Sequence, residues 1–114
     1  MNMNRYVADT MALILRLEKR RMPENVKETF RRAEREEVEI DIPAIVFAEL
    51  GYLAEKKRIE TTLAEAKTYL ATFPSIKEKP MTLSTVKEAF EIDDIPELHD
   101  RLIAATGKEF NIPI

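Results

Sequence analysis

RYVADTMALILRL, residues 5–17, contains the clearest indication of the fold class. Residues 6–8 form a short apolar run that is typical of a buried strand, and this run stops at Asp9. Residues 11–17 then continue as an apolar helix, which Asp9 or Thr10 can cap through its side-chain oxygen. A strand that passes directly into a helix predicts an α/β protein.

The same alternation continues along the rest of the chain. Further strands are predicted at residues 39–42, 79–81 and 111–114. Strands that are separated by helices form parallel pairs through right-handed crossovers, so we expect a mostly parallel central sheet flanked by helices in three layers. The helices are predicted at about residues 23–35, 43–57, 63–73, 84–90 and 97–107, with Thr61 or Thr62 capping the third of these, Ser84 or Thr85 starting the fourth, and Asp93, Asp94 and Pro96 introducing the last.

Composition limits the classes of function. The chain has 114 residues, 45% hydrophobic and 34% charged, which predicts one soluble globular domain. It has no cysteine, which fits a cytoplasmic protein and excludes disulfides and thiolate sites, and its single histidine excludes a histidine cage. The two glycines exclude a glycine-rich phosphate loop, and we expect neither a signal peptide nor a membrane helix. Any metal site must therefore use oxygen ligands and a hard cation.

Three acids occupy positions where a solvated carboxylate is not expected. Asp9 ends the first strand at its carboxyl edge, which is where open parallel sheets bind ligands. Glu49 has apolar neighbours three and four residues away on its helix, and Asp100 flanks the apolar side of the last helix. Burying carboxylates is costly unless a cation compensates for their charge. The three acids together therefore indicate a metal site, although Asp9 alone can be a helix cap and Asp100 alone can pair with a helix dipole.

The chain resembles a known family in three ordered blocks. RYVADTMALI, DIPAIVFAELGYL and IPELHDRLIAATGKEFNIPI are similar to successive segments of PIN domains, especially the VapC-type ribonuclease toxins of prokaryotes. The resemblance covers almost the whole chain, and the ordered set is more specific than any block alone. It implies a single PIN-like domain over residues 1–114.

The resemblance also implies roles for individual residues. Asp9, Glu49 and Asp100 match the acids that bind divalent metal in the family, and Thr10 matches a hydroxyl residue that commonly follows the first acid. In the family, a fourth acidic or polar metal ligand typically follows the strand that residues 111–114 would begin in this chain. The printed sequence ends before that position, so either it stops short of a C-terminal strand and helix segment or the protein lacks this ligand.

These residues predict phosphodiester hydrolysis with Mg²⁺ or Mn²⁺. A carboxylate-held ion neutralises the phosphoryl oxygens and activates water, so no side chain is assigned as general base. The expected protein is an endoribonuclease that acts on RNA, and the resemblance implies that it is the toxin of a toxin–antitoxin pair with an antitoxin as its partner. The alternative is a catalytically silent PIN-fold module that binds RNA or protein. A phosphatase with an aspartyl-phosphate at Asp9 is disfavoured, because its usual second aspartate is replaced by Met11.

Two further patterns leave alternatives open. Residues 11–17 carry more apolar side chains than one buried face needs, which predicts a homodimer or an antitoxin groove, or else a fully buried helix. Basic runs at residues 19–21, 31–35 and 56–58 can contact RNA phosphates, but such runs more often form ion pairs on helix faces. The glutamates available for these pairs are Glu18, Glu28, Glu34, Glu36 and Glu55.

Overall fold

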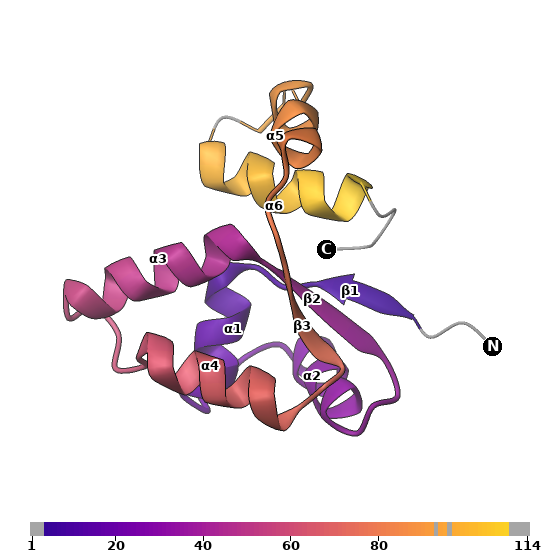
Figure 1. The fold of residues 1–114 in the computed structure, drawn as a ribbon. Coiled ribbons are helices and arrows are strands. Elements are labelled where there is room, and N and C mark those ends of the chain that lie inside the picture. Colours follow the sequence, from indigo (N-terminus) through magenta and orange to yellow (C-terminus); the bar gives the residue numbers. More distant parts are fainter. Residues whose placement is uncertain (1–3, 93, 96, 110–114) are drawn as a thin grey trace.

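Three short parallel strands form one sheet in the order β1-β2-β3 (Figure 1). The structure is a computed structural model that describes residues 4–92, 94–95 and 97–109. Tyr6 pairs with Ile40, and Ile40 pairs in turn with Ile76, so the strands are in parallel register. The predicted parallel α/β architecture is confirmed. The strands are β1 (Arg5–Val7), β2 (Glu39–Pro43) and β3 (Ile76–Lys79).

Helices cover both sides of this sheet. In Figure 1, α2 and α4 lie on one side, with α1 beside them, and the α5–α6 pair lies on the other. Helix α3 follows β2 directly and extends away from the carboxyl edge of the sheet. The helices are α1 (Thr10–Leu17), α2 (Glu24–Glu34), α3 (Ala44–Glu55), α4 (Leu63–Thr72), α5 (Leu83–Phe90) and α6 (Leu98–Glu109).

The main core lies between the sheet and the helices α1, α2 and α3. Leu13, Ile14, Ile42 and Val46 are fully buried there, and Phe30 of α2 is nearly so. Burying a side chain of this size contributes about 1.5–3 kcal/mol to the free energy of unfolding. A smaller cluster holds α5 against α6 through Ala89, Leu102 and Ala105. The main core fixes the first turns of α1 and α3 relative to each other.

Two predicted boundaries were wrong. The third strand is Ile76–Lys79 rather than residues 79–81, because Ile76 is buried against Ile40 and Pro80 has no N–H to give to a sheet. Helix α5 is capped by Thr82, not started by Ser84 or Thr85, since the Thr82 hydroxyl accepts a hydrogen bond from the Thr85 N–H.

The C-terminal part of the chain differs from expectation in one further respect. Helix α6 runs to Glu109 instead of stopping at Gly107. The predicted strand at residues 111–114 lies outside the described residues. The expected helix starts after Pro23 and Pro43 are confirmed, because α2 and α3 each begin at the residue that follows.

Candidate metal centre at the carboxyl edge of the sheet

One pocket contains all three acids that the sequence singled out. It has a volume of about 190 Å³ and lies where α1 begins, beside the middle of α3 and the first half of α6. Asp9, Glu49 and Asp100 thus meet at one place, although they are far apart in the sequence. The remaining lining residues are Thr10, Met11, Leu53 and Ile103.

Asp9 is held by the start of α1. Its backbone is extended (φ −86°, ψ 176°), and its Oδ1 accepts a hydrogen bond from the Ala12 N–H at 2.8 Å. Asp9 is therefore the N-cap of α1, which is one of the two roles that the sequence left open. A carboxylate has a second oxygen, so capping does not prevent Asp9 from also binding a cation.

Thr10 and Glu49 form the best-defined polar contact of the pocket. The Thr10 hydroxyl donates to Glu49 Oε1 at 2.7 Å, which joins the first turn of α1 to the middle of α3. Thr10 is only 7% exposed, whereas Glu49 is half-buried. The contact therefore sets the position of a carboxylate that still faces the pocket.

Asp9 and Asp100 differ from expectation because both are exposed, not buried, and Glu49 alone of the three is half-buried. The buried face of α6 contains Leu102, Ile103 and Ala105, and Asp100 precedes it at the edge of the pocket. The cost of burying a carboxylate therefore does not arise at this position. Its place on the pocket lining is the observation that connects it with Asp9 and Glu49.

The oxygen donors of this pocket suit Mg²⁺ or Mn²⁺, which prefer carboxylates to nitrogen or sulfur ligands. Within the described ranges, no three Asp, Glu or His side chains are close enough together to hold one ion by themselves. The pocket thus offers oxygen donors of the kind that a hard cation binds, but water molecules would have to complete the coordination of an ion there.

A second polar cluster joins α1, α2 and α4. No local sequence pattern indicates it, because its residues lie far apart in the chain. Arg16 donates two hydrogen bonds to Glu34, at 2.9 and 2.7 Å, and the Tyr69 hydroxyl donates to Glu34 Oε2 at 2.5 Å. Burial raises the pKa of Tyr69 strongly, and its bond to the carboxylate raises it further. Burial opposes ionisation of Glu34, but the two donors hold its pKa below the ordinary value.

This cluster borders the largest of the described pockets, which lies between α1, α2 and α4. The pocket has a volume of about 470 Å³, and its apolar lining comes from Leu15, Leu17, Met22 and Phe73. The predicted apolar surface at residues 11–17 is thus divided. Leu13 and Ile14 belong to the core, Met11 is exposed, and Leu15 and Leu17 are half-buried in this pocket.

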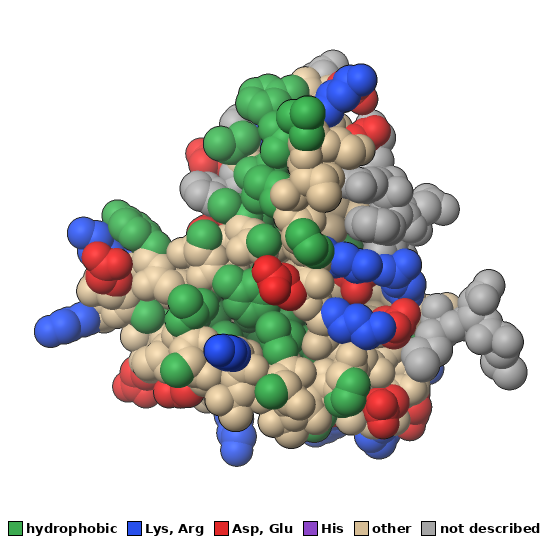
Figure 2. Space-filling view, viewed as in Figure 1, with side chains coloured by type: hydrophobic (Ala, Val, Ile, Leu, Met, Phe, Trp, Pro, Cys, Tyr) green, Lys and Arg blue, Asp and Glu red, His purple; other side chains and the backbone are tan. Residues whose placement is uncertain are grey.

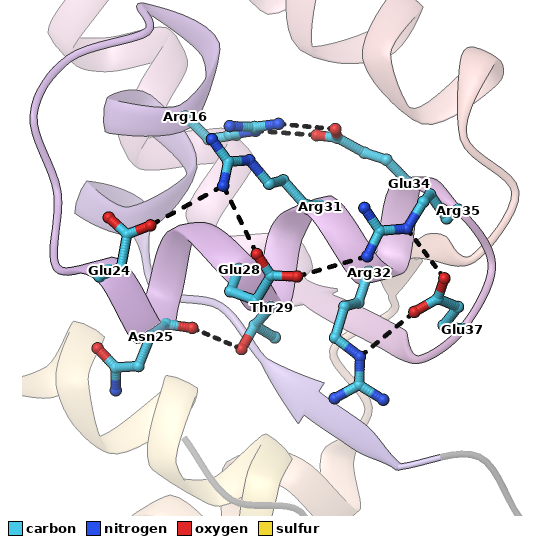
Figure 3. A network of polar contacts seen from close by, with 10 residues as sticks. All are labelled: Arg16, Glu24, Asn25, Glu28, Thr29, Arg31, Arg32, Glu34, Arg35 and Glu37. Carbon is cyan, nitrogen blue, oxygen red and sulfur yellow. Dashed lines mark hydrogen bonds and ion pairs between the residues drawn. The ribbon is translucent and has the colours of Figure 1, made fainter.

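The basic run on α2 forms ion pairs with neighbouring glutamates (Figure 3). Arg31 lies 3.5 Å from Glu28, and Arg35 lies 2.9 Å from Glu37. Arg32 also pairs with Glu37, at 3.5 Å. The hydrogen bond to Glu37 raises the pKa of Arg35 and holds that of Glu37 below its usual range. The ion-pair interpretation of this run is confirmed.

Comparison with known proteins identifies the family. The family model for the PIN domain matches residues 6–114. The chain belongs to the PIN domain family. No curated protein matches it. None of the helices in the part of this PIN domain that the structure describes is long and apolar enough to cross a membrane.

Solved structures share the fold of this PIN domain at low sequence identity. One is VapBC2 from Rickettsia felis bound to a promoter DNA fragment, with a matched chain that is 19% identical at a TM-score of 0.69. The match covers 95% of this PIN domain and 83% of the Rickettsia felis chain. A toxin–antitoxin complex from Klebsiella pneumoniae is 16% identical with a TM-score of 0.59, and the match covers 94% and 81% of the two chains. At these identities the likeness shows the fold alone.

Proposed function

We propose that this PIN domain is a Mg²⁺- or Mn²⁺-dependent endoribonuclease of the cytoplasm and the toxin of a toxin–antitoxin pair. The observation that carries the proposal is the meeting of Asp9, Glu49 and Asp100 in one pocket at the carboxyl edge of a parallel sheet. The likeness to toxin–antitoxin complexes supports the biological context.

In this proposal, Asp9 is the central ligand of the ion, and Glu49 and Asp100 bind it directly or through water. A bound divalent ion supplies charge neutralisation at the scissile phosphate and lowers the pKa of water. Asp9 is kept in place by the Ala12 N–H, and Thr10 orients Glu49 through the 2.7 Å hydrogen bond. Leu53 and Ile103 form the apolar part of the lining of the same pocket.

The Asp9→Asn variant tests the nuclease. Asn caps a helix as well as Asp does, so the fold should survive while the carboxylate charge is lost. We expect cleavage of RNA in Mg²⁺ to disappear and the far-ultraviolet circular dichroism spectrum to stay native. Asp94→Asn, at an exposed acid outside the pocket, is the matched control and should cleave as the parent does. Equal cleavage by the Asp9→Asn variant and the parent would refute the mechanism.

The partner proposal uses the larger apolar pocket. We propose that an apolar segment of an antitoxin fills the space between α1, α2 and α4, where Leu15, Leu17 and Phe73 are available to it. The pocket is bordered by Lys19 and Lys27, so acidic residues in that segment would find opposite charge.

One observation favours a second candidate, a PIN-fold module that binds RNA or protein without cleaving it. The described acids do not form a group of three that could hold an ion unaided. The two candidates differ in melting temperature with Mn²⁺. A metal-binding nuclease is stabilised by the ion, and the gain shrinks in Asp9→Asn. A silent module shows equal melting temperatures with Mn²⁺ and with chelator.

A further inference from the structure

Two of the three basic runs come together at one end of the molecule. We call this surface the basic end, and it consists of Lys19, Arg20, Arg21, Lys56, Lys57 and Arg58. A shallow pocket of about 450 Å³ joins the two runs, because Arg20 lines it together with Lys57 and Arg58. The Glu18 carboxylate ties the runs together, since it accepts hydrogen bonds from the backbone N–H groups of Glu60 and Thr61.

The cations of the basic end form fewer ion pairs with glutamates than the cations of the basic run on α2 do. All six of its side chains are exposed. Within the described residues, its one ion pair is between Arg20 and Glu18, at 3.3 Å. The arginines of α2, by contrast, are held by Glu24, Glu28 and Glu37. In a chain with a net charge of −3, this concentration of positive charge is a local feature.

The basic end continues the side of α3 that carries the acidic pocket. Leu53 lines that pocket, and Lys56, the C-cap of α3, follows it by three residues, which is the spacing of neighbours on one helix face, whereas Lys57 and Arg58 lie beyond the end of the helix. At about 1.5 Å per residue, Lys56 at the end of α3 lies about 10 Å along the helix from Glu49. Figure 2 shows Lys and Arg side chains projecting at the left, over the C-terminal end of α3.

An exposed aromatic ring lies between the two features. Tyr52 is 57% exposed, and the Lys56 ammonium lies 5.5 Å from the centre of its ring. Tyr52 is three residues from Glu49 and so lies beside it on α3. An exposed ring next to cations is the combination on which single-stranded nucleic acids stack their bases and bind their phosphates.

The chemistry of the basic end favours a nucleic acid over a protein. The pocket that joins the two runs is lined by three cations, by Glu18 and Glu60, and by a single apolar residue, Ile59. Protein interfaces depend on a buried apolar centre, whereas nucleic-acid backbones are bound by Lys and Arg. We propose that the basic end binds the phosphates of single-stranded RNA about three nucleotides from the cleaved bond, at a stacked rise of roughly 3.4 Å each, and that Tyr52 stacks one base. This inference rests on the proposed nuclease function.

Binding without metal tests the basic end separately from cleavage. Fluorescence anisotropy with a labelled 12-nucleotide RNA in chelator gives affinity as a function of KCl concentration. The double variant Lys57→Asn/Arg58→Gln removes two cations, and Asn tolerates the left-handed backbone of Lys57 (φ 57°). Two lost phosphate contacts should lower the salt slope by about 1.4 and weaken binding about twentyfold at 0.1 M salt. Arg32→Gln/Arg35→Gln removes the same charge from α2 and should bind within twofold of the parent.

Tyr52 and substrate length give independent readouts. Tyr52→Ala should weaken RNA binding about tenfold, and Tyr52→Phe should bind as the parent does, because stacking needs only the ring. In Mg²⁺, the Lys57→Asn/Arg58→Gln variant should raise KM for the 12-nucleotide RNA while leaving kcat unchanged, and a dinucleotide should be cleaved equally by variant and parent.

Three outcomes separate the alternatives. Equal losses in the Lys57→Asn/Arg58→Gln and Arg32→Gln/Arg35→Gln variants would overturn the proposal, because only net charge would then matter. Unchanged RNA affinity with reduced binding of a glutamate decapeptide would overturn it in favour of an acidic protein partner. RNA binding that depends on the basic end, in a protein that never cleaves, would support the surface while refuting the nuclease.

Discussion

The hydrogen bond from Thr10 to Glu49 offers the sharpest test of the site's geometry. The 2.7 Å contact joins the first residue of α1 to the middle of α3, and its donor is almost fully buried. Thr10→Val keeps the size and branching of the side chain but removes the donor. Thr10→Ser keeps the donor and removes one methyl group, so it serves as the matched control.

The expected magnitude follows from the charge and exposure of the two partners. A hydrogen bond to a charged group contributes about 1.5–3 kcal/mol to the free energy of unfolding. Glu49 is half-buried and can regain water when Thr10 is lost, so the lower value applies. We therefore expect Thr10→Val to cost about 1.5 kcal/mol, or a melting temperature lower by about 6 °C in a domain of this size.

A double-mutant cycle measures the contact itself. Urea unfolding of the parent, Thr10→Val, Glu49→Ala and the double variant, all in chelator, gives the coupling free energy. Thr10→Val should cost about 1.5 kcal/mol with Glu49 present and less than about 0.5 kcal/mol in the Glu49→Ala background. The same cost in both backgrounds would show that Thr10 and Glu49 do not interact, and that the pocket is not arranged as described.

Two further predictions concern α1 and its end. Leu17→Glu should leave a folded protein that has lost antitoxin binding or self-association, whereas Leu13→Glu should abolish cooperative unfolding, because Leu13 is fully buried. A Leu17→Glu protein with the parent's mass in light scattering and the parent's antitoxin affinity would contradict this prediction. Glu18 accepts hydrogen bonds from the Thr61 backbone and hydroxyl, and these bonds lower its pKa. The contribution of ionised Glu18 to the free energy of unfolding is therefore present above the unfolded pKa of about 4.3 and is lost as the pH falls through the folded pKa. Glu18→Gln should accordingly cost about 1 kcal/mol at pH 7 in chemical denaturation, and the cost should shrink as the pH falls below about 4.3. A pH-independent cost would refute the assignment.

Local patterns predicted the elements of the fold well where the signal lies within a few residues. The apolar run that stops at Asp9, and the helices that start after Pro23 and Pro43, depend on side-chain period, caps and the fixed φ of proline. The third strand was misplaced by three residues. Its position is set by the pairing of Ile76 with Ile40, a contact that local sequence does not encode.

The sequence predicted which three acids line the candidate pocket, but it did not predict their exposure or their hydrogen bonds. Sequence patterns alone indicate an α/β chain of the PIN family, with three carboxylates on elements that reach one sheet edge. The packing of the folded chain determined that Asp9 and Asp100 are exposed and that Thr10 bonds to Glu49. It also decided that the basic run on α2 is ion-paired while the other two meet at one end. Exposure and ion pairing depend on distances between elements that are far apart in the chain, and those distances exist only after the helices have packed on the sheet.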